Sequence, residues 1–247
     1  MAKPATNFQR KRALVIGIND YYFNPLEYCV RDAQDFSEAL KSIGFHVTIA
    51  INSSYETFRR AFIEFITANQ PNDLILFYFA GHAKTYKQQN YLLLENYSYG
   101  ASKSEEKWMI DGAIPIEYLI KVSIEKTNGA TIFIIDCCRK YLSFEKDNVQ
   151  QKLLNIKGTS KTLIVYSNWP GAVICSETGD HKNGYLMENL LKHITKINVE
   201  IQDILRCVAQ DLRKQTSEMK RLCHNSEFNQ KIFLVTTKDQ GEKCSFF

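Results

Sequence analysis

Two stretches of the sequence place residues capable of nucleophilic chemistry at the end of an apolar run. The first, residues 130–140, reads ATIFIIDCCRK and contains the adjacent cysteines Cys137 and Cys138. The second, residues 73–83, reads DLILFYFAGHA and contains His82. A thiol attacks a carbonyl carbon as the thiolate, and a neighbouring imidazole is the usual base that generates it. If the two runs are neighbouring strands, the sequence predicts a cysteine–histidine site.

A plainer interpretation treats the same residues as structural. Cysteine without a disulfide is usually a small buried side chain, so Cys137 and Cys138 could both belong to the core, with His82 an incidental loop residue. For each residue taken alone this is the more typical situation. The glycine before the histidine, and Asp136 and Arg139 around the cysteines, occur together, and the combination favours the catalytic interpretation.

The segments that must position these residues alternate between strand and helix patterns. Short apolar runs predict strands, and apolar residues at helical spacing predict helices, the second of which has a capping pattern at Ser53 and Glu56. Such alternation is typical of a mostly parallel sheet covered on both faces, with functional residues beyond the carboxyl ends of the strands. The predicted strands are residues 12–17, 45–51, 73–79, 91–94, 130–135, 162–167 and 231–236. The predicted helices are residues 30–43, 55–66, 114–124, 185–194 and 199–220.

Composition and charge argue against several classes of function. The 247 residues carry a net charge of +4 without a basic cluster, so no nucleic-acid partner is expected. No apolar stretch reaches the roughly 18 residues that span a bilayer, so no membrane association is expected. Seven scattered cysteines indicate a reducing, cytoplasmic setting, and the absence of a CxxC pair or a dense acidic cluster predicts no metal. No glycine-rich phosphate-binding motif occurs, so no cofactor is expected.

The two motifs resemble the active-site motifs of the caspase-like cysteine peptidases of clan CD, peptidase family C14. The form DCCRK is more similar to paracaspases than to caspases or metacaspases. The segments RALVIGINDY, RDAQDF and NGYLMENLL are also similar to that family, and the resemblance extends from about Arg12 to Thr236. It implies a caspase-like three-layer α/β sandwich, in which helices cover both faces of a six-stranded, mostly parallel sheet.

The resemblance also implies a division of the chain around a single caspase-like domain. This domain would join a large-subunit-like region to a small-subunit-like region through a connecting loop. The expected parts are an N-terminal lead (1–11), the domain (12–236) with its large-subunit-like region (12–140), connecting loop (141–161) and small-subunit-like region (162–236), and a C-terminal tail (237–247).

By the same resemblance, catalytic roles fall on residues of the two motifs. Cys138 stands before Arg139, where the family has its nucleophile, and His82 would be the general base and acid. The backbone N–H groups of Cys138 and of Ala83 would form the oxyanion hole. The family usually has glycine where this chain has Ala83, and alanine keeps the N–H but restricts the backbone angles. Cys137 would point into the core.

Specificity can be argued from acidic residues, because paracaspases cut after arginine using acids. Asp32 and Asp136 match two of those acids. The third acid position falls on Val173, and Glu177 a few residues later is a substitute. A buried acid pair is costly unless a cation fills it, and the forked donors of arginine suit this arrangement. The alternatives are that Asp32 is a helix N-terminal acid and that Asp136 caps a strand end.

Two functions remain open from the sequence. The first is a cysteine endopeptidase that cleaves protein or peptide substrates after a basic residue, with arginine preferred to lysine. The second is a catalytically weak or inactive caspase-like module that acts by binding partners. Members of the family commonly pair through the last strand, so the resemblance also implies a homodimer formed through residues 231–236, an apolar edge strand.

Overall fold

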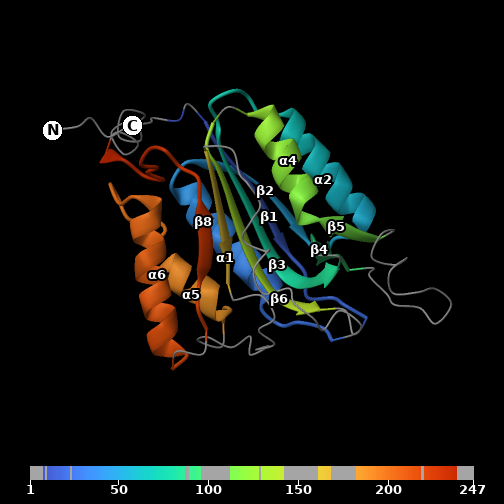
Figure 1. Ribbon diagram of the computed structural model, residues 1–247. Coiled ribbons are helices and arrows are strands. Elements are labelled where there is room, and N and C mark those ends of the chain that lie inside the picture. Colours follow the sequence, from blue (N-terminus) through green and yellow to red (C-terminus); the bar gives the residue numbers. More distant parts are fainter. Residues whose placement is uncertain are drawn as a thin grey trace.

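The computed structural model of the protein has three layers, with a central sheet between two layers of helices (Figure 1). This is the caspase-like α/β sandwich expected from the sequence. The structure describes residues 8, 10–22, 24–86, 89–95, 112–127, 129–141, 161–167, 182–217 and 220–237, and for residues 138–141 it describes the backbone alone.

Six strands form the path across the sheet, in the order β2-β1-β3-β6-β7-β8. The first five run parallel, and β8 pairs antiparallel with β7. The apolar side chains of β1, β3 and β6 are buried on both faces, which is why these strands read as continuous apolar runs. The strands are β1 (Lys11–Gly17), β2 (Phe45–Ile51), β3 (Leu74–Tyr86), β6 (Thr131–Tyr141), β7 (Thr162–Tyr166) and β8 (Cys223–Ser226). Two short strands lie off this path, β4 (Gln89–Leu93) on the end of β3 and β5 (Ala113–Pro115) on β4.

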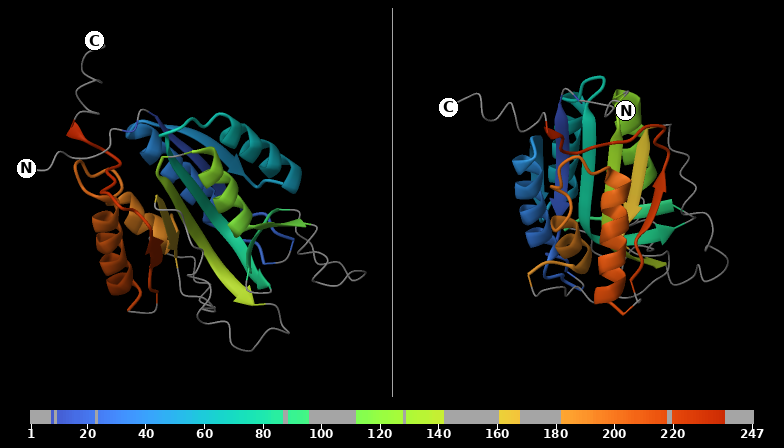
Figure 2. Two further views of the ribbon diagram at one scale, coloured as in Figure 1. Left: turned by 45° about the horizontal axis from the view of Figure 1, so that its top comes forward. Right: turned by 90° about the vertical axis from the view of Figure 1, so that its left-hand side faces the viewer.

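Helices cover the two faces of the sheet unequally, as Figure 2 shows from two directions. α2 (Tyr55–Thr67) and α4 (Ile116–Lys126) pack on one face. α1 (Cys29–Ser42), α5 (Tyr185–Leu191) and α6 (Ile201–Gln215) pack on the other. Alternate residues of β3 therefore enter different cores, Phe77 and Phe79 on the α2 side and Tyr78 on the α1 side. Within the part of the chain that the structure describes, no helix has the length and apolar character needed to cross a bilayer.

The last strand of the sheet is not where the sequence placed it. Residues 231–236 form no strand of the sheet, although Ile232 is fully buried in the core on the α1 side. The carbonyl groups of Ile232 and Val235 accept hydrogen bonds from the N–H groups of Ile201 and Asn198, at the start of α6. The prediction was wrong because this segment buries its apolar side chains beside a helix instead of in the sheet. β8, with the polar sequence CHNS, takes the edge position.

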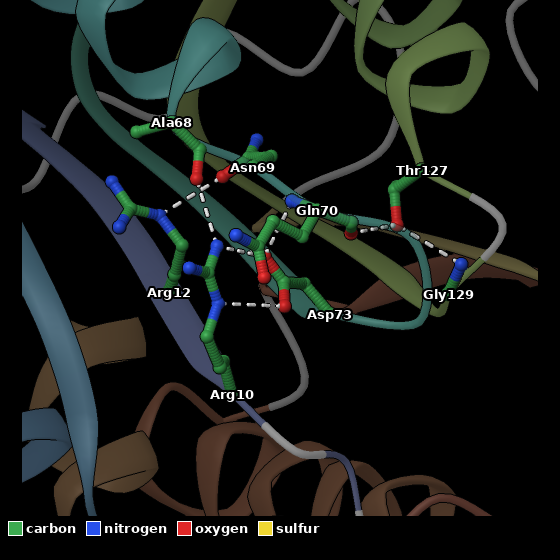
Figure 3. A network of polar contacts seen from close by, with 8 residues as sticks. All are labelled: Arg10, Arg12, Ala68, Asn69, Gln70, Asp73, Thr127 and Gly129. Atoms are coloured by element: carbon green, nitrogen blue, oxygen red, sulfur yellow. Dashed lines mark hydrogen bonds and ion pairs between the residues drawn. The ribbon is translucent and has the colours of Figure 1, made fainter.

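A polar network ties together the amino ends of the central strands (Figure 3). Arg10 donates to both carboxylate oxygens of Asp73, at 3.0 and 2.7 Å, and the Gln70 N–H donates to the same carboxylate at 2.8 Å. Thr127 donates through Oγ1 to the Gln70 carbonyl at 3.4 Å and accepts from the Gly129 N–H at 3.0 Å. The segments that lead into β1, β3 and β6 are thus joined at one edge of the sheet.

Candidate active site

The two residues expected to do the chemistry are backbone neighbours at the carboxyl ends of β3 and β6. The two strands pair in parallel, and His82 is the register partner of Cys138. Paired strands lie about 4.8 Å apart, so the two backbones come within one strand spacing of each other. Cys137 is 6% exposed and packs in the core on the α2 side, as expected for a structural cysteine.

The imidazole of His82 is held by a backbone carbonyl. Its Nε2 lies 2.7 Å from the carbonyl oxygen of Asn24, a residue with a positive φ of 54°. A carbonyl oxygen only accepts, so we assign the Nε2 proton to this hydrogen bond. Nδ1 is then the ring nitrogen that carries no proton and can act as a base.

Tyr21 supports His82 from the α2 side of the sheet. The two rings lie 4.4 Å apart between centroids, and the His82 N–H donates to the Tyr21 hydroxyl at 2.9 Å. That hydroxyl donates in turn to the Leu93 carbonyl at 2.9 Å. A Cβ at Gly81 would lie 2.5 Å from the hydroxyl, so a side chain there would displace the phenol. Sequence analysis missed Tyr21 and Asn24, which stand in a turn-rich loop without a motif of their own.

Asp32 is buried in the first turn of α1, facing the sheet. The residue is 2% exposed, and its Oδ1 accepts from the Asn183 side chain at 3.0 Å and from the Gly184 N–H at 2.9 Å. Burial, and next the charge of Asp136, raise the pKa of Asp32 to about 8, against the opposing effect of these hydrogen bonds. The carboxyl is therefore mostly protonated at neutral pH.

Asp136 is the other acid of this region and lies on β6, opposite Ala80 of β3. Burial raises its pKa, and a hydrogen bond from Ser167 and the charge of Lys220 oppose the shift. The charge of Asp136 acts on the pKa of Asp32, which shows that the structure brings the two acids near each other. Because the charge of Asp136 raises the pKa of Asp32, we assign the lower pKa of the pair to Asp136.

The remaining expected site residues are placed less favourably or not at all. Ala83 is 2% exposed, and its backbone pairs with Leu92 of β4 on one side and Arg139 of β6 on the other. Glu177 and Val173 lie outside the described residues. Among the residues that the structure describes, no three His, Cys, Asp or Glu side chains gather in a way that could hold a metal ion.

Comparison with solved structures supports the fold. The structure of caspase-1 from Spodoptera frugiperda superposes with a TM-score of 0.63 at 14% identity, covering 93% of this chain and 91% of that chain. The structure of pro-sf-caspase-1 gives a TM-score of 0.67, also at 14% identity, over 97% of each chain. At this level of identity the likeness extends to the fold alone.

Comparison of sequences assigns the family. The mucosa-associated lymphoid tissue lymphoma translocation protein 1 homolog of Mus musculus is 23% identical over 239 residues, which are 95% of this chain and 27% of that protein. The Homo sapiens protein is 23% identical over 206 residues, 83% of this chain and 24% of that protein. The chain thus spans about a quarter of the length of these relatives. The model of the family Peptidase_C14, described as the caspase domain, matches residues 10–234, and the chain belongs to this caspase-domain family.

Proposed function

We propose that the protein is a cysteine endopeptidase that cleaves peptide bonds after a basic residue, with arginine preferred. One observation carries the proposal, the pairing of His82 with Cys138 in a single register across two parallel strands. The hydrogen bond from Nε2 of His82 to the Asn24 carbonyl adds to it, because this bond leaves the base in the productive tautomer.

In the proposed reaction the Cys138 thiol gives its proton to Nδ1 of His82, and the thiolate attacks the scissile carbonyl carbon. Collapse of the tetrahedral intermediate breaks the C–N bond, and His82 returns the proton to the leaving amine. Water, activated by the same imidazole, then attacks the thioester carbonyl and releases the acid product and the thiol. The positive charge on the imidazolium is transient and is stabilised by the Asn24 carbonyl dipole.

We propose the N–H groups of Ala83 and Cys138 as the donors that stabilise the oxyanion. Ala83 lies between paired strands, so this role requires its N–H to leave the ladder when substrate binds. The same pairing is the observation that favours the second candidate function, a weakly active or inactive module that acts by binding other proteins.

Arginine preference is proposed from the acids Asp32 and Asp136. Two carboxyl groups near each other in a buried setting repel when both are ionised, and a cation between them removes that cost. A guanidinium presents five donors in a planar fork and suits a pair of carboxylates better than the compact ammonium of lysine does. Binding of arginine would therefore release the proton that Asp32 holds at neutral pH.

Replacing Tyr21 by phenylalanine is expected to weaken both the fold and the reaction. The substitution removes the acceptor of the partly buried His82 N–H and the donor to the buried Leu93 carbonyl. We expect a loss of about 1–3 kcal/mol in the free energy of unfolding, measured by urea denaturation. We also expect kcat/KM to fall about tenfold, because the imidazole loses its support. Tyr22→Phe is the matched control, since Tyr22 is 80% exposed, and equal behaviour of the two variants would contradict the prediction.

Labelling tests the proposed function directly. A peptide with a C-terminal arginine acyloxymethyl ketone should form one adduct with the protein, located on Cys138 by mass spectrometry of the digest. Cys138→Ala should abolish the adduct, whereas Cys137→Ala, the matched control, should retain it. A folded protein that forms no adduct on Cys138 is not an endopeptidase of this kind, and the interaction module becomes the function. Labelling by an aspartate peptide but not by the arginine peptide would overturn the specificity.

Residues 231–236, through which a homodimer was expected, form no strand of the sheet, so we propose that the protein pairs with a second copy through the sheet edge at β8 instead. Within the described part of the chain this strand pairs with β7 alone, and its other edge offers backbone groups to a partner strand. Light scattering at high concentration should give twice the monomer mass, and a monomer there would count against the dimer. The described cysteines form no disulfide with one another, and we propose a cytoplasmic location on the same grounds as in the sequence.

A further inference from the structure

The phenol of Tyr78 is an unusual group to find in the middle of the sheet. Tyr78 is 0% exposed, and among the described residues its hydroxyl has no hydrogen-bond partner. A buried hydroxyl without a partner loses its hydrogen bonds to water and gains none, which costs stability. Phenylalanine would fill the same space without that cost, so the hydroxyl calls for an explanation.

Tyr78 lies on the face of the sheet against which α1, with Asp32, packs. Ala80, two residues later on the same face, is the register partner of Asp136. From the side of α1, the ring of Phe36 packs against the Tyr78 ring with centroids 5.0 Å apart, and Phe36 follows Asp32 by one helical turn. Of the side chains on this face of β3, the methyl group of Ala80 is the one next to the phenol toward the carboxyl end. The phenol thus lies between α1 and the sheet, two residues before the position where Asp136 pairs with β3.

The electrostatics agree with this position. Burial, and then the charges of Asp32 and Asp136, raise the pKa of Tyr78 well above its usual value, so the phenol remains a hydrogen-bond donor at every working pH. Cys29 of α1 contributes a smaller effect on the pKa in the same direction. Of the elements packed on this face, β1 presents Ala13 and Val15, which carry no charge.

As long as the acid pair is empty, Asp32 offers the hydroxyl no strong acceptor. At neutral pH Asp32 is mostly protonated, since its pKa is about 8. A protonated carboxyl is a weaker acceptor than a carboxylate, whose hydrogen bonds are shorter and about twice as strong. Binding of a cation ionises Asp32 and turns it into the stronger acceptor that the phenol lacks.

We propose that Tyr78 determines charge selectivity at this site, by donating a hydrogen bond to the acid pair when a cationic substrate side chain is bound. The inference rests on the proposed function, because it assigns a role beside the same substrate residue. Tyr78 acts through the acids and is a positioning residue, not a catalytic one. The unpaired hydroxyl lowers the stability of the empty protein, and the hydrogen bond that it forms when the cation binds offsets this loss.

The test compares two substrates that differ in charge but hardly in shape. Peptides ending in arginine and in citrulline, its uncharged isostere, are assayed with the wild-type protein and with Tyr78→Phe. We expect the ratio of the two kcat/KM values to fall about tenfold in the variant, which corresponds to one hydrogen bond to a charged group. The rise of arginine cleavage with pH should move to higher pH, because the carboxylate has lost a donor. The empty variant should be as stable as the wild type or more stable in urea.

Tyr166→Phe is the matched control, since Tyr166 is buried on β7 in the core on the opposite face. It should leave the arginine-to-citrulline ratio unchanged. A Tyr78→Phe variant with an unchanged ratio overturns the inference, whether or not the variant also loses stability.

Failure of the proposed function has a different signature, namely that the wild-type protein forms no adduct with the arginine probe. In that case binding alone decides the inference. Nα-acetylarginine amide should raise the melting temperature of the wild type more than the citrulline amide does, and Tyr78→Phe should reduce the difference. Equal shifts from the two amides in the wild type would overturn the role of Tyr78.

Discussion

Replacement of Asp32 by asparagine should lower kcat/KM for arginine substrates about 100-fold or more and at the same time stabilise the protein at alkaline pH. In the proposed complex Asp32 pairs with the arginine side chain of the substrate. Removing one partner of a buried charge pair costs about 3–5 kcal/mol, which at 1.4 kcal/mol per factor of ten gives the expected loss in kcat/KM. Asparagine keeps an oxygen that can accept from Asn183 and Gly184, so the local structure has no reason to change.

The effect on stability follows from the direction of the pKa shift. The pKa of Asp32 is raised from 3.8 to about 8 on folding, so the folded protein binds a proton that the unfolded chain has released. The stability due to this group is complete below pH 3.8 and is lost as the pH rises through about 8. Asp32→Asn removes this dependence, so its advantage over the wild type should increase from pH 6 to pH 9, as measured by urea denaturation.

A second acid on the same helix provides the control. Asp35 also accepts from the Asn183 side chain, at 3.0 Å, but it is partly exposed and lies 3.6 Å from Arg31. Asp35→Asn should change arginine cleavage less than threefold and should not show the gain at pH 9. If Asp32→Asn retained the arginine preference, the acid pair would not be the specificity site. If it were destabilised equally at both pH values, the assigned protonation of Asp32 would be wrong.

Replacement of Gly17 by alanine should destabilise the fold by about 3 kcal/mol or more, the upper part of the range for overpacking in a rigid core. A Cβ there would lie 2.1 Å from the carbonyl oxygen of Cys29 and 2.8 Å from the Cβ of Ala33. A backbone carbonyl in a helix cannot move aside by itself, so the start of α1 must shift away from β1. These two residues flank Asp32, and arginine cleavage should fall together with stability.

Thermal and urea denaturation of the Gly17→Ala variant measure this effect. Gly112→Ala is the control, because no atom lies within 4 Å of the Cβ it would add. That variant should match the wild type within about 0.5 kcal/mol. A Gly17→Ala protein of wild-type stability would show that α1 approaches the sheet less closely than the structure has it.

The central strands could be predicted from the sequence because their side chains are buried on both faces. β3 and β6 are apolar runs that end in polar residues, and this pattern locates His82 and Cys138 at one edge of the sheet. The β3 and β6 strands extend beyond their predicted ends, to Tyr86 and Tyr141, and their later residues continue to pair with each other in register. The helix cap was predicted one residue early, at Ser53, whereas the side chain of Ser54 accepts from the Thr57 N–H.

Residues that act through backbone contacts could not be predicted in this way. β8 has a polar sequence and owes its place to pairing with β7, while the apolar segment that follows packs beside α6. Asn24 holds His82 through its carbonyl group, which every residue possesses, so its side chain gives no signal. Tyr21 stands in a turn-rich loop and Tyr78 in an apolar strand, and only the positions of their hydroxyl groups distinguish them from other aromatic residues.

The polar network at the amino ends of the central strands has a consequence for chemistry at their carboxyl ends. A Cβ at Gly129 would lie 1.8 Å from the Asp73 carbonyl oxygen, so glycine is what lets the start of β6 reach β3, where Ile75 pairs with Thr131. From that pair to His82 and Cys138 each strand advances seven residues, or about 23 Å. A slip of one residue would turn Asp136 to the other face of the sheet. The alignment of the proposed nucleophile with its base is therefore set at a distance, by residues that no substrate touches.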